Sequence, residues 1–336
     1  MKRDHKILII KPSSLGDIIH SLPALSIIRK SFPTSYIAWL VNGNFKEILE
    51  GHPYLDEIIS FPRYLFFKKG FSFLKELKER HFDMVIDLQG LLRSALIGFW
   101  SGAGERIGFK AGREFSPLFY TRPIEIEAGI LHAVDRNARL ASSISGGIFD
   151  LDFTFSLSAR AIKKIEELLK GLEFKGEIIA LNPATRWPSK RWPEEKWASL
   201  ADALAEKGAV FFISGPGEEE VVKRIRGLMK KSSFSLAGQL SLQELAVFLS
   251  RSRLLITIDS GPMHLAGALH IPLISLFGPT DPARCGPYGQ SENVIRVTLD
   301  CSGCYRTRCQ EMTCMKGIDT GLVLKKLEDI LKRNYP

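Results

Sequence analysis

The first candidate for chemistry is a carboxylate close to the start of the chain. Asp17 closes the segment KPSSLGD, which follows the short apolar run 6–10 and opens an expected helix. An Asp at such a strand-to-helix junction can cap the helix by accepting bonds from its free N–H groups. It can also serve as a general base if it faces a ligand. The segment is neither a GxGxxG loop nor a Walker loop, so both interpretations of Asp17 stay open.

A second candidate is the basic loop NPATRWPSKRWP at residues 182–193. Its Arg and Lys side chains can clamp a diphosphate and neutralise the charge of a leaving group. Alternatively, the loop is only a solvated basic turn, in which Trp192, Pro193 and Glu194 start the next helix. We favour ligand binding because the loop directly follows an expected strand.

Further polar residues follow other expected strands. In the segment DSGPMH, residues 259–264, small residues open a helix whose free N–H groups could bind an anion. His264 in that segment is either a ligand contact or a buried structural histidine. Glu218 either binds hydroxyl groups or caps a helix, and the segment FGPTDP at 277–282 could be simple turn chemistry.

Four of the five cysteines are clustered near the end of the sequence, at positions 301, 304, 309 and 314. They could bind zinc or an iron–sulfur cluster, although gaps of four residues are longer than in usual zinc pairs. The alternative is a compact loop of reduced thiols. The first 284 residues contain no cysteine, which favours a reducing compartment over a disulfide framework.

Short apolar runs alternate with amphipathic stretches along most of the chain, a rhythm typical of parallel α/β sheets. Strands are expected at residues 6–11, 36–41, 84–88, 177–181, 209–213, 254–258 and 272–277. Helices are expected at residues 17–31, 72–81, 91–101, 132–143, 159–172, 194–207, 218–230, 242–250, 264–269 and 320–332. The rhythm restarts near residue 177, which predicts two Rossmann-like domains with ligand sites at the carboxyl ends of their strands.

Composition limits the class of protein. The chain has 336 residues, of which 45% are hydrophobic and 25% charged, as in an ordinary folded protein. No apolar run is long enough to span a membrane, and Lys11 ends the first one after four residues, so export is not expected. The net charge of +9 suggests an anionic partner, but no nucleic-acid-binding module accompanies it.

Taken together, five segments resemble the bacterial ADP-heptose:lipopolysaccharide heptosyltransferases of glycosyltransferase family 9. The segments are KPSSLGDIIHSLPAL, DLQGLLRSAL, RWPSKRWPEEKW, IDSGPMHLAGAL and FGPTDP, in this order. The resemblance implies an α/β fold of the GT-B type, with two Rossmann-like domains whose parallel sheets face each other across a cleft. It implies an acceptor-binding domain at 1–160, a nucleotide-sugar-binding domain at 161–318 and a C-terminal helix at 319–336.

The resemblance also implies roles for individual residues. Asp17 matches the catalytic base, and Lys190 matches the cation that holds the donor diphosphate. The donor is further expected to contact Thr185, Arg186, Glu218, Asp259, Ser260, Gly261 and His264. The acceptor is expected to contact Lys11, Ser13, Ser14, Gly16, Arg93 and Arg113. No cofactor or catalytic metal is expected, since the only DxD motif, Asp150–Asp152, lies outside these segments.

The implied reaction is an inverting transfer of heptose from ADP-heptose to the Kdo or inner-core region of lipopolysaccharide. The segments HAVDRN at 132–137 and EFSPLFYTR at 114–122 resemble heptosyltransferase I, which adds the first heptose to Kdo. The loop WPSKRWP is more like heptosyltransferase II, whose acceptor is already heptosylated. A nucleotide-sugar-binding protein without catalysis is the alternative from another class.

An amphiphilic acceptor implies a location at the cytoplasmic face of the inner membrane. The stretch 63–80 holds six basic and two acidic residues and is rich in aromatic ones. Basic and aromatic side chains together suit an anionic membrane surface. We expect Tyr64–Phe71 to contact that surface, whereas residues 74–80 form a helix that packs on the sheet.

Overall fold

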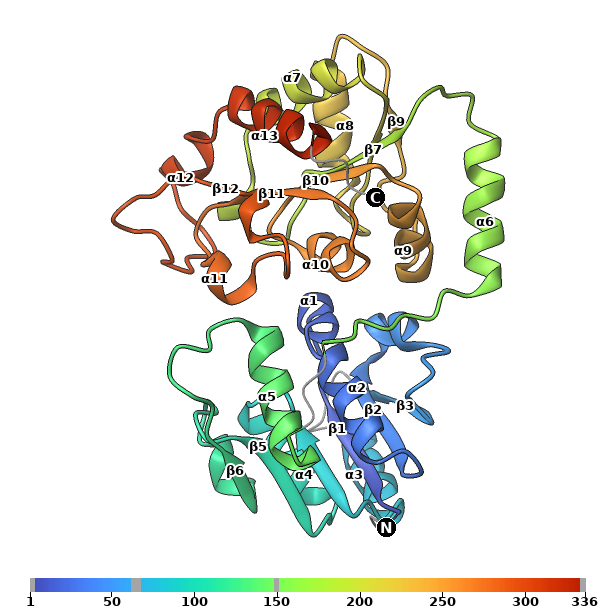
Figure 1. Ribbon diagram of the computed structural model, residues 1–336, viewed down its shortest axis with the longest axis vertical. Helices are drawn as coiled ribbons and strands as arrows, with labels where there is room; N and C mark the ends of the chain where they lie inside the picture. The colour runs from blue at the N-terminus through green and yellow to red at the C-terminus, as the bar shows by residue number, and fades with distance from the viewer. Residues whose placement is uncertain (1–3, 62–67, 148–150, 333–336) are drawn as a thin grey trace. The chain divides into compact units, whose positions relative to one another are not determined.

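The computed structural model describes residues 4–61, 68–147 and 151–332. The chain divides into two compact units, Met1–Ser156 and Leu157–Pro336, and each is described here by itself. The division precedes helix α6, within the stretch where the sequence pattern changes. In Figure 1 the first unit runs from blue to green and the second from green to red.

The first unit contains a six-stranded parallel sheet with the order β3-β2-β1-β4-β5-β6. Its strands are β1 (Lys6–Ile10), β2 (Tyr36–Asn42), β3 (Glu57–Phe61), β4 (Met84–Asp87), β5 (Glu105–Phe109) and β6 (Arg122–Ile124). The central strand β1 is apolar on both faces because both are covered, and Ile7 through Ile10 are completely buried. Neighbouring strands β2 and β4 flank it, which puts a topological switch point beside β1.

Helices cover both faces of this sheet. They are α1 (Leu15–Ile19), α2 (Leu22–Ser31), η1 (Gly43–Leu49), α3 (Lys68–Glu79), α4 (Leu92–Trp100), η2 (Ser116–Phe119) and α5 (Ala133–Ser145). Leu8 and Ile10 pack with Leu74 and Leu77 of α3 and Ile97 of α4 in one core cluster. Figure 1 shows α2 beside α5, where Asn137 donates hydrogen bonds to the His20 carbonyl and the Ser21 hydroxyl.

The prediction of a single helix at 17–31 is wrong in one respect, because two helices occupy this stretch. Helix α1 ends at Ile19, and α2 begins at Leu22 with a proline in its first turn. Pro23 has no N–H to donate and restricts the residue before it, so a new helix start replaces a continuous helix. The Ser21 hydroxyl bridges the break by donating to the Asp17 carbonyl at 2.8 Å.

The second unit repeats the architecture with the strand order β12-β11-β10-β7-β8-β9, again parallel throughout. Its strands are β7 (Ile178–Asn182), β8 (Ala209–Phe212), β9 (Phe234–Ser235), β10 (Leu254–Ile258), β11 (Leu273–Phe277) and β12 (Val294–Arg296). Its helices are α6 (Ala159–Lys170), η3 (Pro188–Lys190), α7 (Glu194–Leu204), α8 (Glu219–Leu228), α9 (Leu242–Ser250), α10 (Gly261–Ala268), α11 (Pro282–Cys285), η4 (Ser291–Asn293), α12 (Thr313–Lys316) and α13 (Thr320–Lys332).

One apolar cluster holds the second unit together. Trp192 and Trp197 pack edge to face, with ring centroids 5.2 Å apart, inside a core that also contains Leu181. Helix α13 contributes Val323, Leu327 and Ile330 to the same core. The C-terminal helix therefore packs within the second unit. On this unit's border, α6 lies beside α9 in Figure 1, and Arg251 pairs with Glu166 at 2.9 Å.

Candidate functional site

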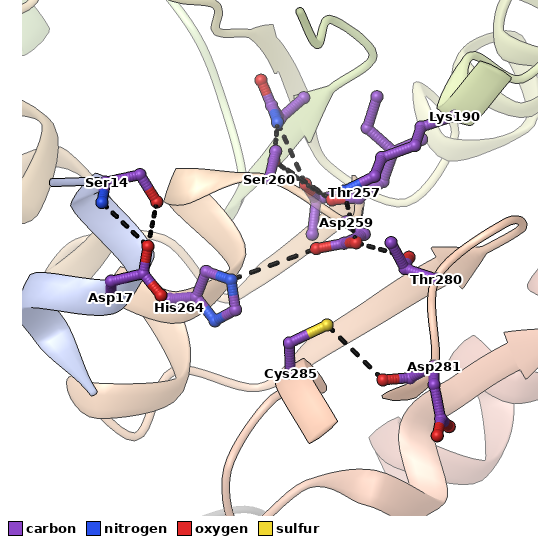
Figure 2. A network of polar contacts seen from close by, with 12 residues as sticks. Ser14, Asp17, Lys190, Thr257, Asp259, Ser260, His264, Thr280, Asp281 and Cys285 are labelled. Atoms are coloured by element: carbon purple, nitrogen blue, oxygen red, sulfur yellow. Dashed lines mark hydrogen bonds and ion pairs between the residues drawn. The ribbon is translucent and has the colours of Figure 1, made fainter. Parts of the chain in front are cut away.

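The loop after β1 presents Asp17 through a local hydrogen-bond arrangement. Ser14 is the residue that caps helix α1, and Asp17 is the third residue of that helix. The Ser14 N–H and hydroxyl both donate to Asp17 Oδ2, at 2.8 and 2.9 Å (Figure 2). Asp17 is therefore not the N-cap residue itself, but it does cap the start of α1 as the third residue of a capping box. Within the described part of the chain, the other oxygen, Oδ1, makes no hydrogen bond, and the Asp17 residue is half-buried.

Two charged side chains close to this loop, those of Lys11 and Asp87, are buried. The Lys11 ammonium donates to the Leu88 carbonyl at 2.8 Å and is almost completely enclosed, and burial lowers its pKa. The Asp87 carboxylate has no exposed surface, and burial raises its pKa despite several donors. Lys11, expected on the acceptor side, thus points into the protein and joins the end of β1 to the loop after β4.

Asp87 organises the loop after β4 by accepting four hydrogen bonds. Oδ1 accepts from the main-chain N–H groups of Gln89 and Gly90, at 2.8 and 3.1 Å. Oδ2 accepts from the hydroxyls of Ser94 and Tyr120, at 2.7 and 2.8 Å. A carboxylate with this many donors can remain charged in the interior because each bond favours the charged form.

The Tyr120 ring reaches Asp87 by lying directly against Gly108 in β5. A Cβ atom at Gly108 would lie 2.3 Å from the Tyr120 ring, far inside contact distance. Glycine is therefore required here for a close approach, not for an unusual backbone angle. Nearby, the exposed Arg113 donates its main-chain N–H to the Gly90 carbonyl at 2.9 Å.

A buried ion pair stands at the carboxyl ends of the second unit's strands. Lys190 Nζ lies 2.6 Å from Asp259 Oδ2, and both side chains are largely buried. The Thr280 hydroxyl donates to the same Asp259 oxygen at 2.6 Å, as Figure 2 shows. The Lys190 ammonium also lies 4.4 Å from the centre of the Trp187 ring, a favourable cation–π contact. These contacts fix Lys190 beside the start of α10.

The start of α10 is held in place by a chain of hydroxyl and amide contacts. Asn182 Nδ2 donates to the Thr257 hydroxyl at 3.0 Å and to the Ser260 hydroxyl at 2.7 Å. The helix itself begins at Gly261, three residues earlier than expected, with Pro262 in its first turn. His264 Nε2 lies 4.0 Å from Asp259 Oδ1 (Figure 2). Cation and helix N-terminus together make this edge suitable for a phosphate.

Glu218 lies in a second group of charges in the same unit. Its Oε2 accepts the Gly215 N–H at 3.2 Å, and burial raises its pKa while Arg186 and Arg191 act in the opposite direction. Glu218 is the residue before α8 by position, but it makes no side-chain cap bond to that helix. Thr185, expected to contact phosphate, is buried, and Arg186 is exposed.

The structure brings together some of the expected donor residues and adds others. Lys190, Asp259, Ser260 and His264 meet around the ends of β7 and β10. Thr280 and Asn182 belong to the same network, but neither was singled out by its residue type. The signal that could have found them was position, because Asn182 is the last residue of β7 and Thr280 lies in the loop after β11.

The structure describes all four clustered cysteines, at positions 301, 304, 309 and 314. Over residues 4–61, 68–147 and 151–332, no three His, Cys, Asp or Glu side chains are arranged to hold a metal ion. None of the five cysteines forms a disulfide. Burial raises the pKa of the Cys314 thiol. The metal and the reduced-loop interpretations of this cluster both stay open.

Comparison with known proteins assigns the family. The sequence model of "Glycosyltransferase family 9 (heptosyltransferase)" matches residues 71–315. The chain belongs to glycosyltransferase family 9. Two relatives named "Lipopolysaccharide heptosyltransferase 1" are each 30% identical to it. The one from Pseudomonas aeruginosa is matched over 90% of this chain and 87% of its own length. The one from Escherichia coli K12 is matched over 87% and 93%.

Solved structures agree with this family assignment. The Escherichia coli heptosyltransferase WaaC, solved with ADP, has a TM-score of 0.76 and 28% identity over 96% of this chain and 99% of its own. A family 9 glycosyltransferase from Veillonella parvula has a TM-score of 0.84 at 24% identity over 99% of both chains, which is evidence for the fold alone. The expected GT-B fold is confirmed. In the part of the chain with described structure, no helix is long and apolar enough to cross a membrane.

Proposed function

We propose that this member of family 9 transfers heptose from ADP-heptose to the core of lipopolysaccharide. The observation that carries the proposal is the 30% identity to named lipopolysaccharide heptosyltransferases over almost the whole chain. The solved WaaC structures with ADP and with ADP-2-deoxy-2-fluoro heptose, each 28% identical, support ADP-heptose as the donor. The Lys190–Asp259 group provides a cation and a helix start suited to its diphosphate.

For the acceptor, we propose the Kdo region of Kdo-lipid A, as in heptosyltransferase I. Several relatives with that name are 30% identical to the chain, whereas the heptosyltransferase 2 of Escherichia coli is 27% identical. Addition of the second heptose to a heptosylated core is the alternative acceptor assignment. A binding protein without catalysis is disfavoured because Asp17 and Lys190 are both present.

The proposed mechanism is a single displacement with inversion. Asp17 Oδ1 takes the proton of the acceptor hydroxyl as its oxygen attacks the anomeric carbon of heptose. The bond between that carbon and the diphosphate breaks, and ADP leaves with the bonding electrons. Lys190 and the N–H groups at the start of α10 neutralise the charge that develops on ADP. No metal takes part, so transfer should continue in the presence of a chelator.

A transfer assay tests the proposal. Purified protein is incubated with ADP-heptose and Kdo-lipid A, with EDTA in a parallel reaction, and products are identified by mass and by anomeric coupling. We expect one heptose added to the acceptor with inverted configuration, and ADP released in equal amount. Consumption of ADP-heptose without a glycosylated acceptor would reject the acceptor assignment. If no ADP-heptose is consumed, the proposed transferase activity is rejected.

The protein is further proposed to act at the anionic cytoplasmic face of the inner membrane. The expected contact, Tyr64–Phe71, lies mostly outside the described residues, so the argument rests on its sequence. Co-sedimentation with anionic and neutral vesicles tests it, using the wild type and a Phe66→Ser/Phe67→Ser/Lys68→Glu/Lys69→Glu variant. We expect salt-sensitive binding to anionic vesicles by the wild type only. Equal binding by a folded variant would contradict this contact.

A further inference from the structure

The cysteine segment, residues 301–314, contacts the loop that carries Lys190. Ser189, which directly precedes Lys190, is almost completely buried. Its hydroxyl donates to the Arg306 carbonyl at 2.6 Å, and its main-chain N–H donates to the Thr307 carbonyl at 3.3 Å. A buried hydroxyl has to be satisfied inside the protein, so these two bonds fix the short helix η3 just before its last residue.

The same segment also contacts the loop after β11. The Tyr305 N–H donates at 2.9 Å to the carbonyl of Pro279, which directly precedes Thr280. At the end of the segment, Cys314 packs against Gly278. A Cβ atom at Gly278 would lie only 3.2 Å from Cys314 Sγ, so the absence of a side chain allows this close approach. The cysteine segment is therefore held on the loop after β11 at two points.

These contacts join the two loops whose side chains hold the Asp259 carboxylate. Lys190 Nζ and the Thr280 hydroxyl each lie 2.6 Å from Asp259 Oδ2, although one follows β7 and the other follows β11 (Figure 2). The cysteine segment bonds to the residue directly before each of them. Residues 305–307, which belong to no helix or strand, therefore form a bridge that sets the distance between the two loops.

We propose that the bridge 305–307 holds Lys190 and Thr280 in place around Asp259, and that Ser189 is a positioning residue for Lys190. The inference rests on the proposed function, since it takes the donor diphosphate as the ligand of Lys190. A lysine ammonium sits on a flexible stem, and freedom that is lost on binding weakens the affinity for a ligand. The bridge restricts the main chain from which Lys190 extends before the ligand arrives, so less freedom is lost when ADP binds.

Replacement of Ser189 by alanine tests the bridge, with ADP binding to the full chain measured by calorimetry. Ser189→Ala removes the hydroxyl bond and leaves the main-chain bond to Thr307. We expect the dissociation constant for ADP to rise roughly 2- to 10-fold, the effect of one hydrogen bond. Ser252→Ala is the matched control, because this buried hydroxyl donates to the Phe248 carbonyl at 2.9 Å and lies just before the amino end of β10. Its affinity for ADP should equal that of the wild type.

A double-mutant cycle shows whether the effect passes through Lys190. If Ser189 positions Lys190, Ser189→Ala should cause no further loss of ADP affinity in the Lys190→Ala background. An equal loss in both backgrounds would mean that Ser189 acts on the second unit as a whole, and would overturn the inference. An unchanged ADP affinity of the single Ser189→Ala variant would overturn it as well.

Hydrogen exchange of the wild type gives a second measurement that needs no variant. Coupling between two sites is reciprocal, so ADP should stabilise a bridge that favours its own binding. We expect ADP to slow exchange of the Tyr305 N–H by the same factor of roughly 2 to 10, measured by mass spectrometry of peptides from the cysteine segment. Adenosine, which lacks the phosphates, should leave this exchange unchanged. Equal exchange with and without ADP would overturn the inference.

These outcomes separate the inference from the proposed function. Failure of the proposed function alone would appear as absent heptose transfer while the ADP affinities keep the expected pattern. Failure of the inference alone would appear as normal transfer by the wild type with Ser189→Ala binding ADP as the wild type does. If Lys190→Ala binds ADP normally, the donor assignment and the inference are both overturned. If Ser189→Ala does not fold, hydrogen exchange of the wild type decides.

Discussion

Lys190 already forms an ion pair, because its Nζ lies 2.6 Å from Asp259 Oδ2. A diphosphate that binds Lys190 has to share it with this carboxylate or replace it. Asp259 is held in turn by the Thr280 hydroxyl, which keeps the carboxylate in place when the ammonium moves. The ion pair thus neutralises the buried Lys190 ammonium. Only an anion that competes with the Asp259 carboxylate can bind to it.

Replacement of Lys190 by alanine tests its role at the donor. We expect Lys190→Ala to weaken ADP binding and to slow transfer together, each by roughly 10- to 1000-fold, because the charge acts in both the ground and the transition state. Calorimetry with ADP and initial rates with ADP-heptose measure the two effects. Lys207→Ala, at an exposed position in the same unit, is the control and should match the wild type. Unchanged affinity and rate would reduce Lys190 to a structural partner of Asp259.

The Asp17→Asn variant separates chemistry from local structure. An asparagine Oδ1 can still accept the two Ser14 hydrogen bonds, so the start of α1 should be preserved. We expect turnover to fall by about 10²- to 10⁴-fold with ADP binding unchanged, the usual size of a general-base effect. Single-turnover rates and ADP calorimetry are the measurements. Nearly normal turnover would mean that Asp17 serves only the helix.

Residue types indicated Asp17, the basic loop 182–193 and the turn 259–264, because strand-to-helix junctions in parallel sheets are natural ligand sites. The individual roles of Lys190 and Asp259 came from the family resemblance. Their partners were harder to foresee. Thr280 lies 21 positions from Asp259, and Tyr120 lies 33 positions from Asp87, so only the folded sheet brings these side chains together. Lys11 was expected to contact the acceptor; the fold buries its side chain against the Leu88 carbonyl, and its contact with a ligand stays a prediction.

At the scale of elements, the long central strands and amphipathic helices were predictable because their apolar patterns are unambiguous. The strands β3, β5, β6, β9 and β12 were not expected. They lie at or next to the sheet edges and are short or partly polar, as in ERIGF of β5, so their sequences do not distinguish them from loops. The break between α1 and α2 depends on where the first helix ends and the second is capped. The spacing of apolar residues does not show this.

His52 connects the loop before β3 to the segment that ends the first unit. Its Nε2 contacts the Thr154 carbonyl at 3.1 Å, and its Nδ1 accepts the Tyr54 N–H at 3.2 Å. This pattern requires the neutral ring with hydrogen on Nε2. Burial lowers the pKa of His52 to about 4, against the opposing effects of Thr154 and Asp152.

The pKa of His52 predicts a pH-dependent loss of stability. A base whose folded pKa lies below its unfolded value of about 6.5 binds more protons when unfolded, so its contribution is complete above that pH and is lost as pH falls toward 4. We expect a loss on the order of 3 kcal/mol across this window. Urea unfolding of the wild type and of His52→Gln between pH 4 and 7.5 measures it. If the free energies of unfolding of the two proteins change equally with pH, the assignment to His52 is contradicted.

On the scale of the whole molecule, each unit has its own sheet and its own apolar core. All expected donor residues belong to the second unit, and Asp17 and the acceptor residues belong to the first. This division was visible in the sequence as a rhythm that stops and restarts. The family resemblance supplied the identity of donor and acceptor, which no periodicity contains.

Hydrogen exchange of the full chain tests this division. Addition of ADP should slow exchange in the loop after β7 and at the start of α10, because those N–H groups gain a bound anion. Exchange in strands β1, β2 and β4 should remain unchanged. Mass spectrometry of peptides from both units, with and without ADP, gives the comparison, and adenosine serves as the control without phosphates. Equal protection of the first unit's core strands would argue against separate donor binding.

The contact between Gly108 and Tyr120 has an evolutionary consequence. Any side chain at position 108 would collide with the Tyr120 ring, and any displacement of that ring would remove one donor from the buried Asp87. The two positions are therefore constrained as a pair. Across the homologous sequences, a bulkier residue at 108 should occur only where the aromatic ring at 120 has also been lost, so the two columns should covary although twelve positions separate them.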